Sequence, residues 1–159
     1  MFPMKFSIRQ LLFLRQFILI MGVILTSYLI YVNNLSDSTL SCGNVGDCNK
    51  VQNSSYGFLF GVPVTYFGLV FFCFLAILYG NYFLRKNILN VNIIELVGFS
   101  ASLSAFIFSM YLTYIELFVI NEICIWCVSI ALLTTLIFII NFCSLIFIKK
   151  HVEDDDKQL

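Results

Sequence analysis

The stretch ICIWCVSIALLTTLIFIINFCSLIFIKKH, residues 123–151, decides the fold class of this chain. Its apolar part, Ile123–Ile148, is longer than the roughly 20 residues that a helix needs to cross a bilayer. Lys149 and Lys150 end the run, as basic residues end many membrane helices at the cytoplasmic surface. The stretch therefore predicts a membrane-spanning helix.

Three further apolar runs precede it, at Phe13–Val32, Phe58–Leu84 and Val91–Ile120. Of the 159 residues, 60% are hydrophobic and only 11% are charged, whereas about a quarter of a typical soluble domain is charged. The sequence predicts an all-α integral membrane protein, an antiparallel four-helix bundle over residues 1–150. We expect the acidic tail, residues 151–159, to be disordered. We interpret the first run as an uncleaved helix because no clear small-residue cleavage site follows it.

The basic residues set the expected orientation of the bundle. Every Lys and Arg except Lys50 lies in the first 15 residues, the link between the second and third runs, or the C-terminal segment. The positive-inside rule assigns these segments to the cytoplasm. Both polar turns, Asn33–Gly57 and Asn121–Cys124, then lie outside, where disulfides persist. The net charge of zero argues against a nucleic-acid partner.

The six cysteines divide by position. Cys73 and Cys143 lie inside apolar runs, where we expect them to pack as small hydrophobic residues. Cys42 and Cys48 bracket GNVGD in the first outer loop, a sequence suited to the tight backbone that a disulfide requires. A bridge across so small a loop adds little stability, so we interpret the pair as redox-active, with a structural disulfide as the alternative.

Cys124 and Cys127 form C-x-x-C where the last helix begins. The spacing places both sulfurs on one face, near unpaired backbone N–H groups that favour the thiolate, the attacking species in disulfide exchange. A zinc site built from the four outer cysteines is disfavoured, because membrane helices fix the scaffold without a metal. Attachment of haem through C-x-x-C-H is excluded because Val128 follows Cys127. We expect no metal.

A longer pattern joins these motifs. The loop reads C-G-N-V-G-D-C and continues as Cys48-x-x-Val51-x-x-Ser54-x-Tyr56-Gly57-x-x-Phe60-Gly61-x-Pro63, and C-x-x-C opens the last helix. In this order the residues resemble the vitamin K epoxide reductase family in its bacterial form, over nearly the whole chain. The resemblance implies a four-helix bundle in which an outer loop and a short half-helix cap a quinone site.

The resemblance also implies a function, quinone-dependent thiol oxidation in a bacterial inner membrane, with cytoplasmic termini and periplasmic cysteines. Electrons would pass from a soluble, DsbA-like partner of thioredoxin fold to Cys42 and Cys48, then to Cys124 and Cys127, and finally to ubiquinone or menaquinone. This activity supports disulfide-bond formation. We expect the partner to be a separate protein, because no thioredoxin-like domain follows His151.

Other residues are expected to support this site. Ser54 matches the polar residue that the family places near its reactive cysteine. Quinone contacts are expected from Cys127 and Val51, and from Phe60 and Tyr66, for which helix packing is the alternative.

The chain departs from the animal members of the family. They carry a quinone-binding tyrosine where this chain has Ala131, and their quinone-binding asparagine has no convincing counterpart, since Asn81 lies too near the cytoplasmic end. Epoxide reduction is therefore not implied. Glu116 and Glu122 lie near the outer surface, where we expect solvated carboxylates, with a proton relay to the quinone as the alternative.

Two other functions are compatible with four cysteines in a membrane bundle. A DsbB-type enzyme also has two cysteine pairs, but it carries C-x-x-C in its first outer loop instead of at the start of the last helix. A non-enzymatic membrane subunit would use the cysteines as structural disulfides. Redox titration separates a working electron relay from structural disulfides. Inert structural disulfides have potentials below about −300 mV, whereas a working relay must exchange readily with its partner.

Overall fold

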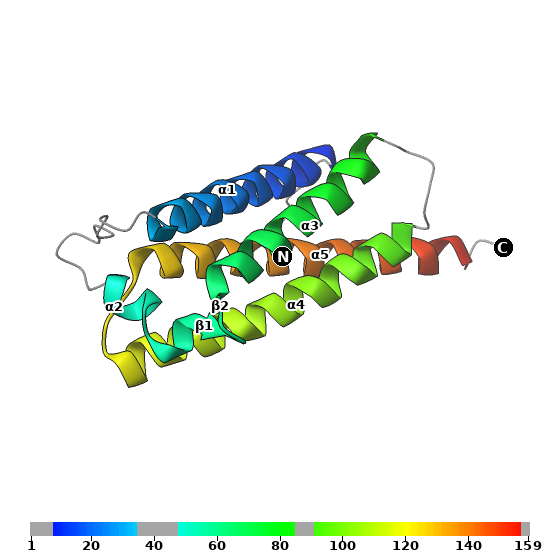
Figure 1. The fold of residues 1–159 in the computed structure, drawn as a ribbon. Helices are drawn as coiled ribbons and strands as arrows, with labels where there is room; N and C mark the ends of the chain where they lie inside the picture. Colours follow the sequence, from blue (N-terminus) through cyan, green and yellow to red (C-terminus); the bar gives the residue numbers. More distant parts are fainter. Residues whose placement is uncertain (1–7, 35–47, 85–90, 157–159) are drawn as a thin grey trace.

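Four long helices form the bundle in the computed structural model, which describes residues 8–34, 48–84 and 91–156 (Figure 1). They are α1 (Ile8–Asn34), α3 (Val64–Leu84), α4 (Val91–Ile115) and α5 (Ile125–Asp156). Helix α1 packs against α3 and α5, and α4 packs against α5. The predicted all-α bundle is confirmed.

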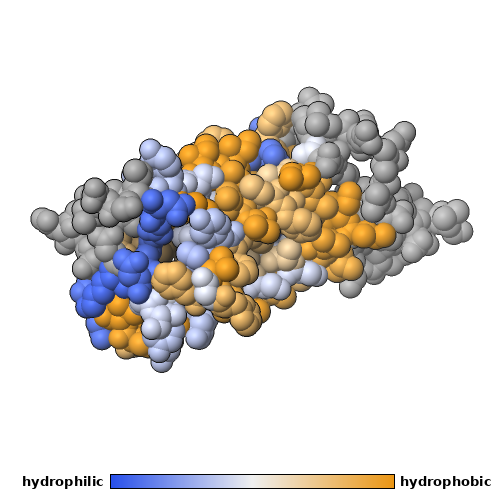
Figure 2. All heavy atoms as spheres, viewed as in Figure 1, coloured by the Kyte–Doolittle hydropathy of each residue, from blue (hydrophilic) through white to orange (hydrophobic). Residues whose placement is uncertain are grey.

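Three helical segments are long and apolar enough to cross a membrane, Gln10–Asn34, Ile93–Ile120 and Ile125–Ile146, and Val64–Gly80 of α3 is a shorter apolar helix. Large apolar side chains cover the middle of the bundle, while most hydrophilic surface on the face in Figure 2 gathers toward the end that carries α2 (Cys48–Gln52). Helices with apolar outer faces are stable in lipid, where every backbone hydrogen bond is made within the helix.

Close contact between α1 and α3 depends on Gly22. The Phe72 ring, which is fully buried, lies against the α1 backbone at this position, and a Cβ atom on residue 22 would overlap it. Small residues at such crossings let membrane helices approach closely. Phe72, Leu19 and Ile137 belong to the main buried cluster of the bundle.

The second helix begins later than predicted. Residues 58–63 form a short antiparallel hairpin, β1 (Phe58–Leu59) and β2 (Val62–Pro63), and α3 starts only at Val64. The turn of the hairpin has positive φ angles at Phe60 (54°) and Gly61 (80°), which a helix cannot accommodate. Pro63 therefore belongs to the hairpin and precedes the helix.

The other predicted boundaries also shift. Helix α4 widens into a π-helical turn, η2 (Glu116–Ile120), and Asn121 then adopts the left-handed conformation with φ of 55°. Helix α5 continues to Asp156, into the segment that we expected to be disordered. Each residue added to an existing helix gains one backbone hydrogen bond, so an apolar membrane helix can extend beyond its apolar part. The division into a 1–150 domain and a tail stays a prediction.

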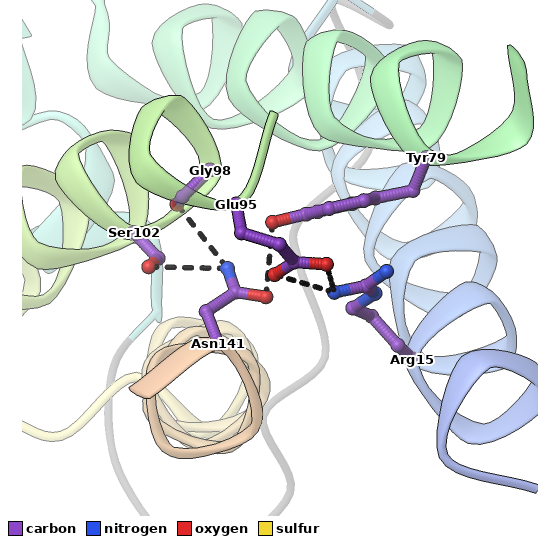
Figure 3. A network of polar contacts seen from close by, with 6 residues as sticks. All are labelled: Arg15, Tyr79, Glu95, Gly98, Ser102 and Asn141. Carbon is purple, nitrogen blue, oxygen red and sulfur yellow. Dashed lines mark hydrogen bonds and ion pairs between the residues drawn. The ribbon is translucent and has the colours of Figure 1, made fainter. Parts of the chain in front are cut away.

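A buried ion pair lies in the half of the bundle farther from α2 (Figure 3). The sequence suggested that Arg15 marks the cytoplasmic side, yet it is only 1% exposed. Its guanidinium lies 3.0 Å from the Glu95 carboxylate and 3.5 Å from the centre of the Tyr79 ring. An arginine in a membrane helix is costly unless its charge is paired inside the bundle. The pairing of Arg15 with Glu95 therefore joins α1 to α4.

The polar network continues into α5 through Asn141 (Figure 3). The Tyr79 hydroxyl donates to Asn141 Oδ1 at 3.1 Å. Asn141 Nδ2 donates at 3.2 Å to the Gly98 carbonyl and at 3.2 Å to Ser102 Oγ. All four long helices are thus connected by polar contacts that the hydrophobic pattern did not predict.

Candidate redox site

The predicted redox cysteines gather at one end of the bundle. There α2 (Cys48–Gln52) and the one-turn helix η1 (Ser55–Gly57) lie near the link between α4 and α5 (Figure 1). Cys48 and Cys124, 1% and 0% exposed, share a buried cluster with Leu29 and Val51, and Cys127 packs against it. The structure therefore brings three of the four predicted cysteines together. Cys42 lies outside the described residues.

The cysteines differ in redox state. Cys48 is disulfide-bonded, whereas Cys124 and Cys127 are free thiols. Cys73 in α3 and Cys143 in α5 are free and partly exposed, and neither belongs to the buried cluster around Cys48. Two electrons are thus held by the C-x-x-C pair in this form of the protein.

The Cys124 thiol has an altered acidity. Hydrogen bonding with the Cys127 side chain lowers the pKa of Cys124 to about 7, and burial opposes this effect. The Cys127 backbone N–H, 3.4 Å from Cys124 Sγ, adds to the lowering because Cys124 lies at the N-terminus of α5. These contacts favour the thiolate form of Cys124.

Gln52 is a polar neighbour of Cys124 that the sequence analysis missed. Its amide Nε2 donates toward Cys124 Sγ at 3.9 Å and helps to lower the pKa of that thiol. Asn33 at the end of α1 donates to Gln52 Oε1, which holds the amide with its N–H groups toward the sulfur. Gln52 is four residues after Cys48 in the sequence, but nothing in that spacing indicated contact with a residue of the last helix.

A cavity of about 320 Å³ opens beside Cys127, within the size range of small-molecule sites. Its walls come from all four long helices and from α2, η1 and η2. Val51 and Cys127 line it, but Phe60 and Tyr66 do not. Phe60 is 95% exposed at the hairpin tip, and Tyr66 accepts a hydrogen bond from Asn34 at 3.3 Å. The aromatic residues of the lining are Tyr56, Phe67, Phe71, Phe72 and Phe108.

Ser54 lies at the cavity wall and ends α2. Its hydroxyl donates to the Val51 carbonyl at 2.7 Å, and its own carbonyl accepts from the Gly57 N–H at 2.9 Å. These bonds close the turn between α2 and η1, so Ser54 positions the segment that carries Cys48. A more direct role near a cysteine stays a prediction.

Thr65 gives the cavity a polar group with an unused hydrogen bond. Its buried hydroxyl has no hydrogen-bond partner among the described residues, and the residue lines the cavity. An unpaired buried hydroxyl costs about 1–3 kcal/mol, a cost that a ligand carbonyl would remove. A largely apolar cavity with such a donor fits a quinone, whose ring is flat and apolar and whose polar atoms are two carbonyl oxygens.

The two outer glutamates, predicted to be solvated, have different environments. Glu122 is partly exposed and forms an ion pair with Lys50 at 3.2 Å, in agreement with a solvated carboxylate. Glu116 is only 6% exposed and lines the cavity, so for this residue the expectation is wrong. Glu116 is the first residue of the π-helical turn η2 and its buried residue.

Comparison with known proteins agrees with this arrangement. The vitamin K epoxide reductase family model matches residues 14–142, which include all four predicted redox cysteines. A search of curated proteins found no match. Members of the matched family act on thiols, use a quinone as electron acceptor and work with a thioredoxin-like redox partner. With three helical segments long enough to span a membrane, this chain is an integral membrane protein that belongs to the vitamin K epoxide reductase family of quinone-linked disulfide oxidoreductases.

Proposed function

We propose that this protein is a thiol oxidase that reoxidises a soluble, DsbA-like partner and thereby supports disulfide-bond formation. Electrons pass from the partner to Cys42 and Cys48, then to Cys124 and Cys127, and from there to a membrane quinone. One observation carries the proposal: Cys48 and Cys124 share a buried cluster, and Cys127 beside them lines the cavity. The chain thus offers a continuous path from the outer loop to a ligand site.

Each transfer in this path is a thiol–disulfide exchange, which needs direct contact between two sulfur atoms. Cys124 is suited to a mixed disulfide with Cys48 because both lie in one cluster. Its low pKa makes it a good leaving group when Cys127 attacks that bond. The reverse arrangement, with Cys127 bonded to Cys48, would leave the low-pKa thiol away from the exchange.

Val51, Thr65 and Cys127 would hold the quinone in the cavity. The quinone supplies the oxidising power, because it takes up two electrons and two protons and leaves as quinol. Aromatic side chains of α3 and α4 line this cavity and would give the ring of the quinone an apolar environment. Ala131 also lines the cavity, where animal members of the family carry tyrosine, so epoxide reduction is not proposed.

The alternative, a membrane subunit with structural disulfides, is less well supported. A structural role would join Cys124 and Cys127 in a stable disulfide, yet both are free thiols. We propose an orientation with both termini in the cytoplasm and the cysteines in the periplasm of a bacterial inner membrane. The Lys and Arg distribution supports this orientation.

The order of the path is tested by replacing Cys127 with alanine. Purified Cys127→Ala should not reduce quinone with dithiothreitol, and a disulfide between Cys48 and Cys124 should accumulate, because the attacking thiol that resolves it is gone. Mass spectrometry after proteolysis detects this bond. Cys143→Ala is the matched control and should keep most of the wild-type turnover. Quinone reduction by Cys127→Ala, or the absence of the Cys48–Cys124 bond, would show that the order is wrong.

A further inference from the structure

Glu116 is a buried carboxyl group at the cavity that the path of electrons does not use. It is the first residue of the π-helical turn η2 and is 6% exposed. Among the described residues that line the cavity, it is the only one with a carboxyl group, and Tyr56 and Cys127 are the other titratable ones. No lysine, arginine or histidine belongs to this described lining.

The contacts of Glu116 connect it to both thiols of the C-x-x-C pair. Glu116 and Cys127 line the same cavity, and the Cys127 side chain and the Cys124 backbone both act electrostatically on the Glu116 carboxyl group. The backbone carbonyl of Glu116 accepts hydrogen bonds from the N–H groups of Asn121 and, at 3.2 Å, of Glu122. These bonds close the π-helical turn at the cavity wall that Cys127 also lines.

The reaction at this place requires proton transfer as well as electron transfer. When Cys124 and Cys127 form their disulfide, the two thiols release two electrons and two protons. The acceptor takes up two electrons and two protons in an apolar cavity, where no other acidic side chain lines the described wall. Carrying a proton across such a wall requires a group that can bind and release it.

We propose that Glu116 is this group, a catalytic carboxyl that takes the proton of the Cys127 thiol and delivers it to one oxygen of the acceptor. The inference rests on the function proposed above. In the reduced pair, Cys124 is a thiolate and Glu116 carries a proton. Glu116 releases this proton to the acceptor, and the ionised carboxyl then binds the proton that leaves Cys127 Sγ as the S–S bond to Cys124 forms and passes it to the acceptor as well. Two electrons and two protons thus reach the acceptor, and Glu116 stays ionised until the pair is reduced again.

Electrostatic coupling with Cys124 supports the assignment. A negative Glu116 opposes ionisation of Cys124, so the charges of the two groups are coupled. The titratable groups that face Glu116 are these two cysteines, and the nearest charged pair, Lys50 with Glu122, lies at the surface. The proton held by Glu116 therefore depends on the redox state of the C-x-x-C pair.

The kinetic test compares Glu116→Gln with Glu116→Asp and Glu122→Gln in the full-length protein. Glutamine keeps an oxygen that accepts hydrogen bonds but cannot carry a proton. We expect quinone reduction by dithiothreitol to fall about 10²- to 10⁴-fold in Glu116→Gln, the range of general acid–base catalysis, and to recover partly in Glu116→Asp. Glu122→Gln, a change at the ion pair with Lys50, should keep the wild-type rate.

A second measurement needs no quinone. Infrared difference spectra between the oxidised and the dithiothreitol-reduced protein should show a protonated carboxyl band that grows on reduction. The band should be present in the wild type and in Glu122→Gln but absent in Glu116→Gln. If Glu116→Gln does not fold, the wild-type spectrum together with Glu116→Asp, in which the band should shift, decides the question.

The outcomes separate this inference from the proposed function. Equal rates in Glu116→Gln and Glu122→Gln overturn the inference while the wild-type activity upholds the function. A carboxyl band that persists in Glu116→Gln, or no band in the wild type, also overturns it. A wild type that does not reduce quinone overturns the proposed function, and the infrared spectra then still decide whether Glu116 exchanges a proton with the cysteine pair.

Discussion

Cys124 illustrates how neighbours determine the chemistry of one side chain. Its thiol contacts donors from two elements, the Cys127 backbone N–H at 3.4 Å and the Gln52 amide at 3.9 Å. Donors stabilise the thiolate more than the thiol, which lowers the pKa, whereas burial favours the neutral form. The balance places the pKa at about 7.

The pH dependence of Cys124 alkylation tests this balance. Iodoacetamide attacks only the thiolate, so the rate for the reduced protein should reach half its maximum at about pH 7, below the value near 8.5 of a free thiol. Gln52→Leu removes one donor and should raise the midpoint by up to about one pH unit, which slows the reaction at pH 7. Peptide mass spectrometry measures the rate, and Asn53→Leu, at an exposed position, is the control. An unchanged midpoint in Gln52→Leu contradicts the assigned role.

Sequence patterns predicted which cysteines lie together but not their surroundings. The spacing and loop placement of the cysteines predicted a redox site, and the structure brings Cys48, Cys124 and Cys127 into one place. Gln52, Thr65 and the burial of Glu116 were missed, since each depends on a neighbour from a distant part of the chain. Hydrophobicity alone could not separate Phe60 and Tyr66, which lie outside the cavity lining, from the aromatic residues that form it.

The existence of the four long helices was predicted, and their boundaries and local irregularities were not. Each apolar run overlaps one of the four long helices, because length and hydrophobicity decide whether a segment can cross a bilayer. The hairpin before α3 and the π-helical turn after α4 are as apolar as the helices beside them, so composition did not reveal them. Both irregularities lie at the end of the bundle that carries the cysteines (Figure 1).

The crossing of α3 and α4 is tested at Gly98. A Cβ atom at this position would overlap the Tyr79 hydroxyl, which donates to Asn141. Gly98→Ala should therefore destabilise the protein by about 1–3 kcal/mol and lower its melting temperature in detergent. Gly80→Ala is the matched control, because its nearest non-local atom would be 3.9 Å away, and it should not lower the melting temperature. Equal melting temperatures for the two variants would contradict the close approach.

The bundle as a whole combines an apolar outer surface with a polar connection inside. The network from Arg15 to Asn141 joins all four long helices (Figure 3). Asn141 lies in the second half of α5, whereas Cys124 and Cys127 lie at its start. At the other end, the cavity separates the same helices. The polar contacts in one half hold the four helices together, and the other half can therefore keep a cavity large enough for a ligand.

A double-mutant cycle on Arg15 and Glu95 tests the contribution of the ion pair. Arg15→Met leaves a buried carboxylate without its partner and should lower the free energy of unfolding by about 3–5 kcal/mol, with a similar loss for Glu95→Leu. The double variant removes both charges and should be more stable than either single variant. Thermal unfolding in detergent measures all four proteins. Additive losses in the double variant would show that the pair does not couple α1 to α4.

The Arg15–Glu95 pair also constrains biogenesis. Helix α1 precedes α4 in the chain, so during synthesis its arginine exists before the carboxylate that pairs with it. An unpaired arginine is costly inside lipid, and we expect Arg15 to stay at the lipid headgroups until α4 arrives. The first helix should then reach its final depth only after the third long helix has inserted.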